Sequence, residues 1–415
     1  MNGLPQTSMT NEEQRVSAYS RKDKPTNPSL VTAETLVGAL NLNWREIDLP
    51  ERVRTKHVHR LHPYLGKFIP QLVEIFLRKY FRAGQTILDP FCGSGTALVQ
   101  ANELGMHSVG YDISAFNVLL CRAKTAKYYA SEVRAELLDI LQSVRDVQPV
   151  ASGQQDLWRR TAEVIRLTEE DSAYLQAWYA PNALRELLTY RRFIDTRPYK
   201  CKDLLRIVLC RSARSARLMT HYELDFPKVP QTTPYWCRKH SHMCAPTTDA
   251  LKFLERYTLD TIRRIEEFAN VRTRAQIVVR HADSRRARFP RVDGVITSPP
   301  YVGLIDYHEQ HAYAYHLLGL RDRRTDEIGA AANGAHAEAR SSYVDDVVEV
   351  FRRALVAMSE GGYMIVVAHD RSGLYGQIAR RLGVKTEAIV ERHVNRRTGM
   401  RSNEFFESVF IWRKQ

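Results

Sequence analysis

The chain has 415 residues, 44% of them hydrophobic, which is enough to bury one large core and a smaller second domain. Its 61 basic residues outnumber the 47 acidic ones, and the net charge of +14 favours a polyanionic partner. No apolar run approaches the length of a membrane span, residues 1–28 lack the apolar core of a signal peptide, and the six cysteines lack the spacing of a secreted disulfide framework. The composition therefore predicts a cytoplasmic protein without a membrane partner.

The N-terminal part of the chain divides into a polar arm and the start of an α/β core. Residues 1–30 are polar and predict a disordered arm, and residues 31–122 predict the first part of the core. Within that part, the run His62-Pro63-Tyr64-Leu65-Gly66-Lys67-Phe68-Ile69-Pro70 precedes an amphipathic helix over residues 71–81. Pro70 fits the first turn of this helix, because the N–H that proline lacks has no helical partner there.

A glycine turn between a strand and a helix predicts a ligand cradle. Residues 86–89 (Thr-Ile-Leu-Asp) read as a buried strand that passes through Pro-Phe-Cys-Gly-Ser-Gly-Thr into a helix over 97–104. Gly93 and Gly95 let the backbone approach a ligand closely, and the helix N-terminus offers free N–H groups. The turn has neither the lysine of a phosphate loop nor the third glycine of the dinucleotide fingerprint, so a phosphate ligand is disfavoured. Asp89, at the end of the strand, suits a ligand that carries an ammonium group.

A second strand, residues 107–111, ends in Asp112. An acidic residue about 20 positions after the first strand, at the end of the second, is placed to bind ribose hydroxyls. The alternative role for Asp112 is the N-cap of a helix that begins at Ile113.

The pattern changes between residues 123 and 274, where helical periodicity appears without alternating strands. This predicts a mainly helical insertion, which is a candidate for target recognition. Its expected helices are 132–145, 160–177, 183–194, 201–218 and 247–269. Cys237, His240, His242 and Cys244 can bind metals, but their spacing is not a standard zinc pattern. Packing or phosphate contacts are the favoured roles for these residues, and no metal site is predicted.

Residues 275–415 predict the second part of the core. Two strands, over 276–279 and 292–296, are followed by Thr297-Ser298-Pro299-Pro300-Tyr301. Proline lacks an N–H, so this segment leaves carbonyl oxygens unclaimed at the carboxyl edge of the sheet, where ligands of open α/β sheets bind. A carbonyl and the Ser298 hydroxyl can accept hydrogen bonds from an amino group, while the ring of Tyr301 can stack on a planar base. The simpler alternative is a strand followed by a proline turn.

Three further strands complete a seven-stranded sheet. They are expected over 363–368, 388–394 and 406–412, the last two as an antiparallel hairpin around Thr398-Gly399. Arginines crowd two stretches of this half of the chain and are candidates for phosphate contacts. They are Arg272, Arg274, Arg280, Arg285, Arg286, Arg288 and Arg291 in the first stretch, and Arg392, Arg396, Arg397 and Arg401 in the second.

With these motifs in place, the chain resembles the DNA amino-methyltransferases that use S-adenosylmethionine to methylate N4 of cytosine or N6 of adenine. Asp89 to Thr96 is similar to their cofactor motif, Thr297 to Tyr301 to the serine form of their catalytic motif, and His62 to Phe68 to the segment that closes over the methionine end of the cofactor. The resemblance implies a Rossmann-like seven-stranded methyltransferase sheet, mostly parallel, with a C-terminal antiparallel hairpin and the helical insertion. The residues that it assigns to the cofactor are Lys67, Phe68, Asp89, Phe91, Gly93, Gly95, Thr96, Asp112 and Asp283. Those that it assigns to catalysis are Ser298, Pro299, Pro300 and Tyr301.

The resemblance also implies the activity and the partners. Asp89 and the glycine backbone would hold the methionine part, Asp112 the ribose, and Asp283 the adenine amino group. Methylation of a base in double-stranded DNA requires the base to be flipped out of the helix. The serine form favours N4 of cytosine over N6 of adenine, and a cognate restriction or defence nuclease is an expected partner. An RNA guanosine-N2 type methyltransferase and a catalytically idle DNA-binding subunit are the alternatives, and the sequence leaves the recognition site and the choice of monomer or dimer open.

Overall fold

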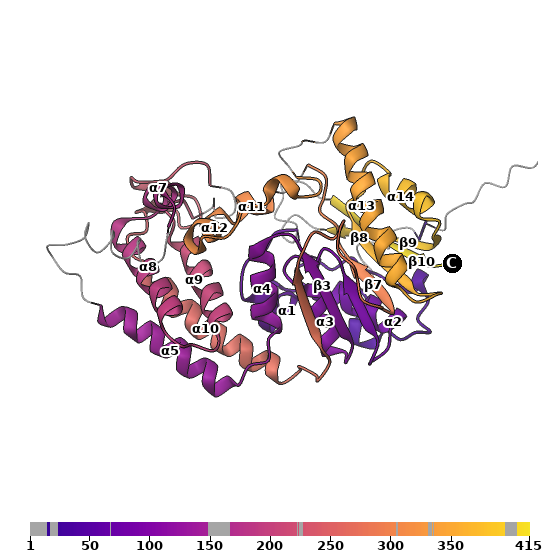
Figure 1. Cartoon of the computed structure of the whole chain (residues 1–415), viewed down its shortest axis with the longest axis horizontal. Coiled ribbons are helices and arrows are strands. Elements are labelled where there is room, and N and C mark those ends of the chain that lie inside the picture. Colours follow the sequence, from indigo (N-terminus) through magenta and orange to yellow (C-terminus); the bar gives the residue numbers. More distant parts are fainter. Residues whose placement is uncertain are drawn as a thin grey trace, which may run out of the picture.

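An eight-stranded mixed sheet forms the core of one half of the computed structural model (Figure 1). The structure describes residues 24–66, 68–147, 167–221, 223, 227–303, 306–330, 334, 336–394 and 406–415, together with the backbone of residues 15–16 and 405. The strands lie in the order β1 (Arg15–Val16), β9 (Lys385–Val394), β10 (Phe405–Arg413), β8 (Tyr363–Ala368), β7 (Gly294–Thr297), β2 (Thr86–Asp89), β3 (His107–Asp112) and β6 (Ile277–His281).

The sheet confirms the predicted Rossmann-like architecture. Strand β10 is antiparallel to both β8 and β9, whereas β8, β7, β2, β3 and β6 run parallel. The seven predicted strands are β2, β3, β6, β7, β8, β9 and β10. The additional strand, β1, consists of two residues from the predicted N-terminal arm, which pair in parallel with Ile389 and Val390. Most of the remaining arm lies outside the described residues, so its disorder stays a prediction.

Neighbouring residues of β2 and β7 pack into two different hydrophobic cores, because side chains alternate between the faces of a sheet. Ile87 and Ile296 pack with α2 (Pro70–Tyr80) and α3 (Thr96–Glu103) on one face. Leu88 and Val295 belong to a second core, which contains residues of α13 (Ala337–Ala357) and α14 (Leu374–Leu382) on the opposite face. Helix α4 (Ala115–Thr125) packs against β3 and β6. Burial on both faces explains why these strands are short continuous apolar runs.

The helical insertion forms a second body beside the sheet (Figure 1). Its helices, α5 (Ala130–Asp146), α7 (Glu169–Trp178), α8 (Pro181–Thr196), α9 (Lys202–Ala216) and α10 (Leu251–Ala269), lie between α4 and β6 in the chain. They share one core with α4, and this core also takes in Tyr313, Ala314 and Leu317 of α12 (Ala312–Leu318). A segment that follows the predicted catalytic motif therefore ties the insertion to the sheet.

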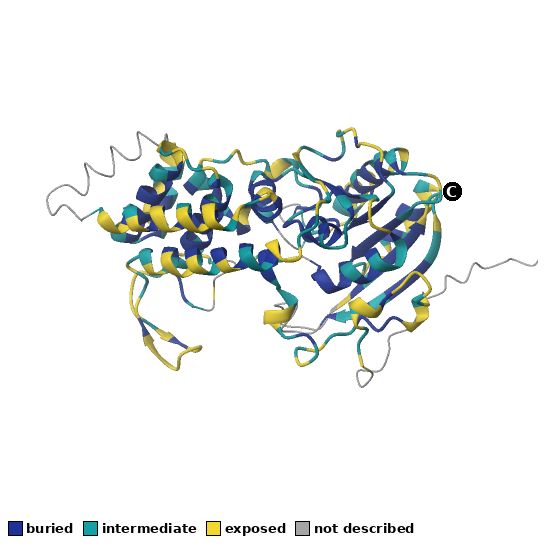
Figure 2. Ribbon diagram, turned by 90° about the horizontal axis from the view of Figure 1, so that it is seen from below, coloured by how far each residue is buried: buried dark blue, intermediate teal, exposed yellow. Residues whose placement is uncertain are grey.

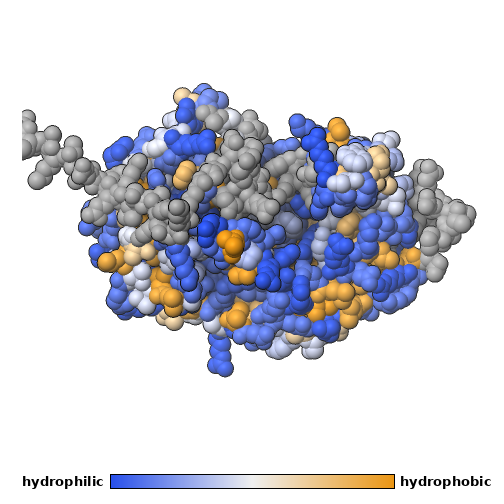
Figure 3. Space-filling model, turned by 180° about the vertical axis from the view of Figure 1, so that it is seen from behind, coloured by the Kyte–Doolittle hydropathy of each residue, from blue (hydrophilic) through white to orange (hydrophobic). Residues whose placement is uncertain are grey.

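Short elements complete the described structure. They are η1 (Pro28–Leu30), η2 (Val37–Ala39), α1 (Glu51–Arg54), η3 (His57–Arg60), α11 (Tyr307–Gln310), η4 (Arg324–Asp326) and a separate hairpin of β4 (Tyr235–Cys237) and β5 (His242–Cys244). On the face seen in Figure 3, hydrophobic residues form separate patches in a mainly hydrophilic surface. None of the described helices is long and apolar enough to cross a membrane.

Candidate active site

A pocket opens beyond the carboxyl ends of β2, β3 and β7. This is the edge at which open α/β sheets bind ligands. Predicted site residues that line the pocket are Phe68, Phe91, Gly93, Thr96, Asp112, Asp283, Ser298 and Pro300. Lys67 lies outside the described residues.

The cofactor motif and the catalytic motif meet at a buried hydrogen bond below this pocket. Strands β2 and β7 are parallel neighbours, and the Thr297 hydroxyl donates to Oδ1 of Asp89 at 2.6 Å. The backbone N–H of Phe91 donates to the same oxygen at 3.2 Å, whereas Oδ2 of Asp89 is buried without a partner among the described atoms. Burial raises the pKa of Asp89 to about 7, although both hydrogen bonds oppose the shift.

The glycine turn requires glycine at both predicted positions. Gly93 and Gly95 have φ values of 47° and 78°, in the left-handed region that disfavours other residues. A Cβ atom on Gly95 would lie 2.9 Å from Sγ of Cys121, and one on Gly93 would lie 3.1 Å from the Tyr64 hydroxyl. Gly93 lines the pocket, where its backbone can approach a ligand, whereas Gly95 does not line it and instead leaves room for Cys121.

Asp112 links this turn to the start of α4. Its Oδ2 accepts from the Gly93 N–H at 2.8 Å, and its Oδ1 accepts from the N–H of Ser114 at 2.8 Å and from the side chain of Asn117 at 3.2 Å. Ser114, rather than Asp112, caps α4 by accepting from the Asn117 N–H, so the N-cap alternative for Asp112 is wrong. Burial raises the pKa of Asp112 to about 6. Its predicted contact with ribose stays a prediction.

Asp283 reaches the pocket from the loop after β6. Its carboxylate accepts from Arg285, with Oδ2 2.9 Å from Nη2, and Arg285 also pairs with Asp346 of α13 at 3.1 Å. Burial opposes ionisation of Asp283, but the Arg285 contacts hold the pKa of this carboxyl below its ordinary value. The side chain therefore presents a fixed negative charge.

The catalytic motif separates the pocket from a neighbouring cavity. Ser298 and Pro300 line the pocket, and Pro299 is buried. Tyr301 instead lines the second cavity together with His369 and Tyr343, and its hydroxyl donates to Oε1 of Glu407 at 3.0 Å. Glu407 is buried with Arg392, whose Nε lies 2.9 Å from Oε2 of Glu407.

Two of the arginines that were predicted to contact phosphate form ion pairs within the protein. Arg392 is buried and paired with Glu407, so the prediction that it contacts phosphate is wrong. Arg285 pairs with Asp283 and Asp346, and its contact with phosphate stays a prediction. Arg396, Arg397 and Arg401 lie outside the described residues. The exposed members of the first stretch are Arg274, Arg280, Arg286, Arg288 and Arg291.

The upper wall of the pocket combines the predicted closing segment with residues that follow the catalytic motif. Tyr64 and Gly66 belong to the predicted closing segment, and the Tyr64 ring stacks on Tyr307 at 5.7 Å and on His311 at 5.5 Å between centroids. Asp326, Glu327 and Ile328 also line the pocket, although no motif points to them.

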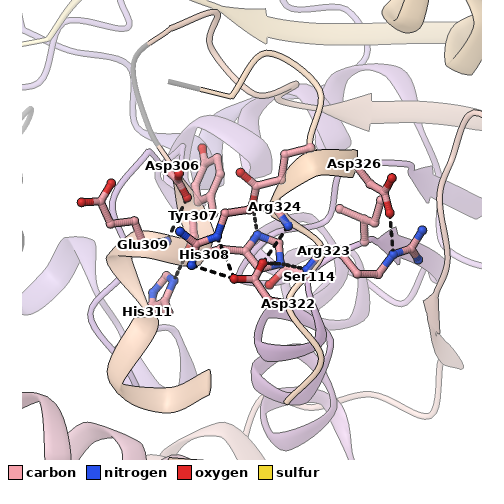
Figure 4. Close-up of polar contacts among 12 residues, drawn as sticks. Ser114, Asp306, Tyr307, His308, Glu309, His311, Asp322, Arg323, Arg324 and Asp326 are labelled. Carbon is pink, nitrogen blue, oxygen red and sulfur yellow. Dashed lines mark hydrogen bonds and ion pairs between the residues drawn. The ribbon is translucent and has the colours of Figure 1, made fainter. Parts of the chain in front are cut away.

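His308 holds this wall together. Its Nδ1 pairs with Glu327, its Nε2 accepts from the Arg323 N–H at 3.2 Å, and Asp322 lies 3.8 Å away. Figure 4 shows Asp322 and Arg323 beside His308, close to Asp306, which caps α11, and to Tyr307 of the same helix. The second half of the site therefore depends on contacts between residues that follow the catalytic motif.

The pocket suits a ligand with positive charge. Asp112, Asp283 and Glu327 line it, and Asp89 lies directly below. Oδ2 of Asp89, Oε2 of Glu327 and Oγ1 of Thr96 are buried polar atoms without partners among the described residues. Buried polar atoms are normally satisfied, so a polar ligand or water in the pocket would supply partners for these three. A molecule with an ammonium group, a sulfonium centre and ribose hydroxyls fits this set of donors and acceptors.

Comparisons with known proteins agree with this geometry. Residues 7–121 match a family of DNA methylases, and residues 81–177 match a methyltransferase domain. The type II methyltransferase M.MjaII of Methanocaldococcus jannaschii is 34% identical over an alignment of 430 positions, which covers 87% of this chain and 81% of that protein. The chain belongs to the type II DNA methyltransferases. Enzymes of this family take the methyl group from S-adenosylmethionine, the cofactor that the motifs predict.

Two further relatives of this methyltransferase are more distant. M.BsoBI of Geobacillus stearothermophilus, also a type II methyltransferase, is 22% identical over 312 residues, covering 69% of this chain and 58% of that protein. A tRNA (guanine(10)-N2)-dimethyltransferase of Methanothermobacter thermautotrophicus is 31% identical over 111 residues, covering 24% of this chain and 33% of that protein.

Proposed function

We propose that this methyltransferase acts on an exocyclic amino group of a base flipped out of double-stranded DNA, with N4 of cytosine favoured over N6 of adenine. The observation that carries the proposal is the hydrogen bond between Thr297 and Asp89, because it joins the two motifs at the edge of one pocket. A cytoplasmic location and a partner nuclease are further predictions of the sequence.

The contacts of the pocket support a division of labour among its residues. Asp89 and the Gly93–Gly95 turn would hold the methionine part of S-adenosylmethionine, and Asp112 would accept from its ribose hydroxyls. Asp283, fixed by Arg285, would accept from the adenine amino group. The cofactor supplies an electrophilic methyl group on a positively charged sulfur.

The Ser-Pro-Pro-Tyr segment would orient the nucleophile. The lone pair of an exocyclic amine is delocalised into the base, so the amine attacks poorly. Ser298 and the neighbouring proline carbonyl would accept from its two N–H bonds, favouring a pyramidal nitrogen and aligning it with the methyl carbon. A bond then forms between nitrogen and the methyl carbon, the carbon–sulfur bond breaks with its electron pair going to sulfur, and the nitrogen loses one proton to solvent.

The cavity beyond the motif is our candidate for the flipped base. It is lined by Tyr301 and His369, and the Tyr301 ring is the candidate surface on which a planar base would stack. This stacking would offset part of the cost of extracting the base, which is about a few kcal/mol.

The exposed arginines support a nucleic-acid substrate. Arg286 and Arg288 follow Asp283 along the loop at the rim of the pocket, and both are exposed. An RNA base methyltransferase is the second candidate, supported by the local match to a tRNA (guanine-N2)-dimethyltransferase. An idle DNA-binding subunit is disfavoured, because the buried atoms of Asp89, Thr96 and Glu327 without partners favour a protein that binds its cofactor.

Methyl transfer from tritiated S-adenosylmethionine tests the proposal. Purified protein is offered unmethylated double-stranded DNA and, separately, tRNA, and the products are digested for nucleoside mass spectrometry. We expect N4-methylcytosine in DNA and no label in tRNA. Exclusive N6-methyladenine would overturn the choice of base, and labelled tRNA with unlabelled DNA would establish the second candidate. Cofactor binding without label in DNA of diverse sequence or in tRNA would contradict both.

A further inference from the structure

Hydrophobic packing does not explain why the β4–β5 hairpin is folded. It stands away from the helices of the insertion (Figure 2), and its two strands have only three residues each. Trp236 and Met243 are 59% and 57% exposed, whereas Cys237 and Cys244 are buried. A two-stranded hairpin is marginally stable in water unless something else fixes it. The side chains between the strands are therefore the place to look for that support.

Four metal-binding side chains meet at this place. The ligand atoms of His221, Cys237, His240 and Cys244 all lie within 4.8 Å of one another. Nδ1 of His221 is 3.5 Å from Sγ of Cys237, and Nδ1 of His240 is 3.3 Å from Sγ of Cys244. The two imidazole rings are 4.7 Å apart between centroids.

The backbone is folded to bring these groups together. The carbonyl of Cys237 accepts from the N–H groups of His240, at 3.2 Å, and Ser241, at 2.7 Å. Ser241 has a φ of 54°, one of two non-glycine residues with positive φ in the described chain. Such strain persists only where the surroundings enforce it. His221 precedes the hairpin in the chain and is tied to it, because its backbone N–H donates to the hydroxyl of Tyr235 in β4 at 3.1 Å.

We propose that His221, Cys237, His240 and Cys244 bind a structural zinc ion that fastens the hairpin to the chain after α9. Two thiolates and two imidazoles form a closed tetrahedral zinc set. Bonds of about 2.3 Å to sulfur and about 2.0 Å to nitrogen place these ligands roughly 3.5 Å apart in a tetrahedron, close to the two nitrogen–sulfur distances above. The spacing of the residues alone does not predict this site, because His221 lies 16 positions before Cys237.

Two other groups of metal-capable residues among the described ones are explained without a metal. Glu103, close to His57 and His59, forms an ion pair with Lys56 at 2.6 Å. In the group of Asp306, His308 and Glu327, Asp306 caps α11 and His308 pairs with Glu327. The hairpin cluster differs because its sulfur atoms contact histidine nitrogens and belong to no ion pair in the described structure.

Metal analysis of full-length, tag-free protein tests the site. The protein is purified without chelator, and zinc is measured by mass spectrometry of the intact preparation. We expect about one zinc per chain, as for other closed four-ligand sites. After removal of the metal, titration with Co²⁺ is expected to give the visible bands of tetrahedral cobalt and thiolate-to-cobalt charge transfer.

Paired variants locate the ion. Cys237→Ser and His240→Ala should each lower the zinc content at least several-fold. His242→Ala should retain it, since Nδ1 of His242 faces the Met243 carbonyl at 2.8 Å and this residue is outside the set of four. Cys210→Ser in α9 controls for loss of a buried cysteine elsewhere. Cofactor binding reports that each variant remains folded, because the pocket is formed by other residues.

The outcomes separate a metal site from chance proximity. Wild-type protein that lacks zinc and gives no tetrahedral cobalt spectrum would overturn the proposal. So would a Cys237–Cys244 disulfide in protein purified under reducing conditions, or full zinc content in both Cys237→Ser and His240→Ala. Accelerated proteolysis within residues 227–244 after chelation, restored to the wild-type rate by added zinc, would support it.

Discussion

The Thr297 hydroxyl lies 2.6 Å from Oδ1 of Asp89, inside the protein and between two adjacent parallel strands. Thr297 begins the catalytic motif and Asp89 begins the cofactor motif, although 208 positions separate them in the chain. The hydrogen bond lowers the pKa of a carboxyl whose burial raises it to about 7. Thr297 therefore favours the ionised form of Asp89, which a cationic ligand requires.

Thr297→Val should weaken cofactor binding. Valine keeps the shape but removes the donor, so the pKa of Asp89 rises further and the carboxylate becomes rarer at neutral pH. We expect the Kd for S-adenosylmethionine to increase roughly tenfold, since hydrogen bonds to charged groups contribute about 1.5–3 kcal/mol. Calorimetric titration measures this. Thr261→Val in α10, a buried threonine away from the pocket, should leave the Kd unchanged; an equal Kd for folded Thr297→Val would refute the coupling.

Cofactor-induced stabilisation should depend on pH. Burial raises the pKa of Asp89 to about 7 and that of Asp112 to about 6, both above the ordinary carboxyl value. In the free protein these groups contribute stability at low pH that is lost as the pH rises through those values, because the folded state holds the protons more tightly. A cationic ligand binds the two ionised carboxylates more tightly than the protonated ones. The stabilisation that it provides therefore increases as the pH rises through the same values.

The measurement is the rise in Tm at saturating S-adenosylmethionine. It should be larger at about pH 8 than at about pH 5.5, where both carboxyls are mostly protonated in the free protein. Asp89→Asn removes the carboxyl with the higher pKa, so the rise in Tm should depend less on pH in this variant. The same rise in Tm at both pH values for the wild type would show that neither carboxyl titrates with binding.

The sheet could be predicted from the sequence because its strands are short apolar runs that end in turn residues. The runs at 86–89 and 363–368 match β2 and β8 residue for residue. The positions of Gly93 and Gly95 also follow from local chemistry, since their positive φ and close neighbours leave room for no side chain. The local sequence pattern is therefore sufficient to predict those parts of the site that depend on the conformation of a few neighbouring residues.

Long-range contacts decided what the sequence could not predict. The direction of Tyr301 depends on Glu407, which lies 106 positions later on β10. Glu327 reaches the pocket because His308 holds it, and α12 joins the insertion through packing that no periodicity reveals. Arg392 looked like a phosphate contact because its stretch is basic, but its buried partner Glu407 is on the adjacent strand.

DNA affinity should fall with salt, and less steeply when the rim arginines are removed. The double variant Arg286→Ala/Arg288→Ala should have a log–log slope that is smaller by roughly 0.9 for each phosphate that these side chains neutralise in the wild type. Fluorescence anisotropy with a DNA duplex over a salt series gives the slope. Arg82→Ala is the matched control, because Arg82 is exposed but precedes β2 and so lies at the opposite edge of the sheet. An unchanged slope in the double variant would exclude these two arginines as phosphate ligands.

Tyr301→Ala should abolish most turnover while leaving cofactor affinity nearly unchanged. The ring lines the cavity proposed for the base and does not line the cofactor pocket, so the two properties should separate. Tyr301→Phe should keep much of the activity because stacking needs only the ring. It should nevertheless lower the free energy of unfolding by about 1.5–3 kcal/mol, because the hydroxyl donates to the buried carboxylate of Glu407.

Three measurements on each variant distinguish stacking from a structural role for Tyr301. They are the turnover number on DNA, the Kd for S-adenosylmethionine and the Tm. Tyr343→Phe is the control, since Tyr343 lines the same cavity and its hydroxyl bonds to Tyr375 rather than to a residue of the catalytic motif. If Tyr301 serves only to pack a proline turn, Tyr301→Ala will lose cofactor binding, turnover and Tm together. A folded Tyr301→Ala protein that methylates DNA at the wild-type rate would remove the ring from the mechanism, because the base would then be held without it.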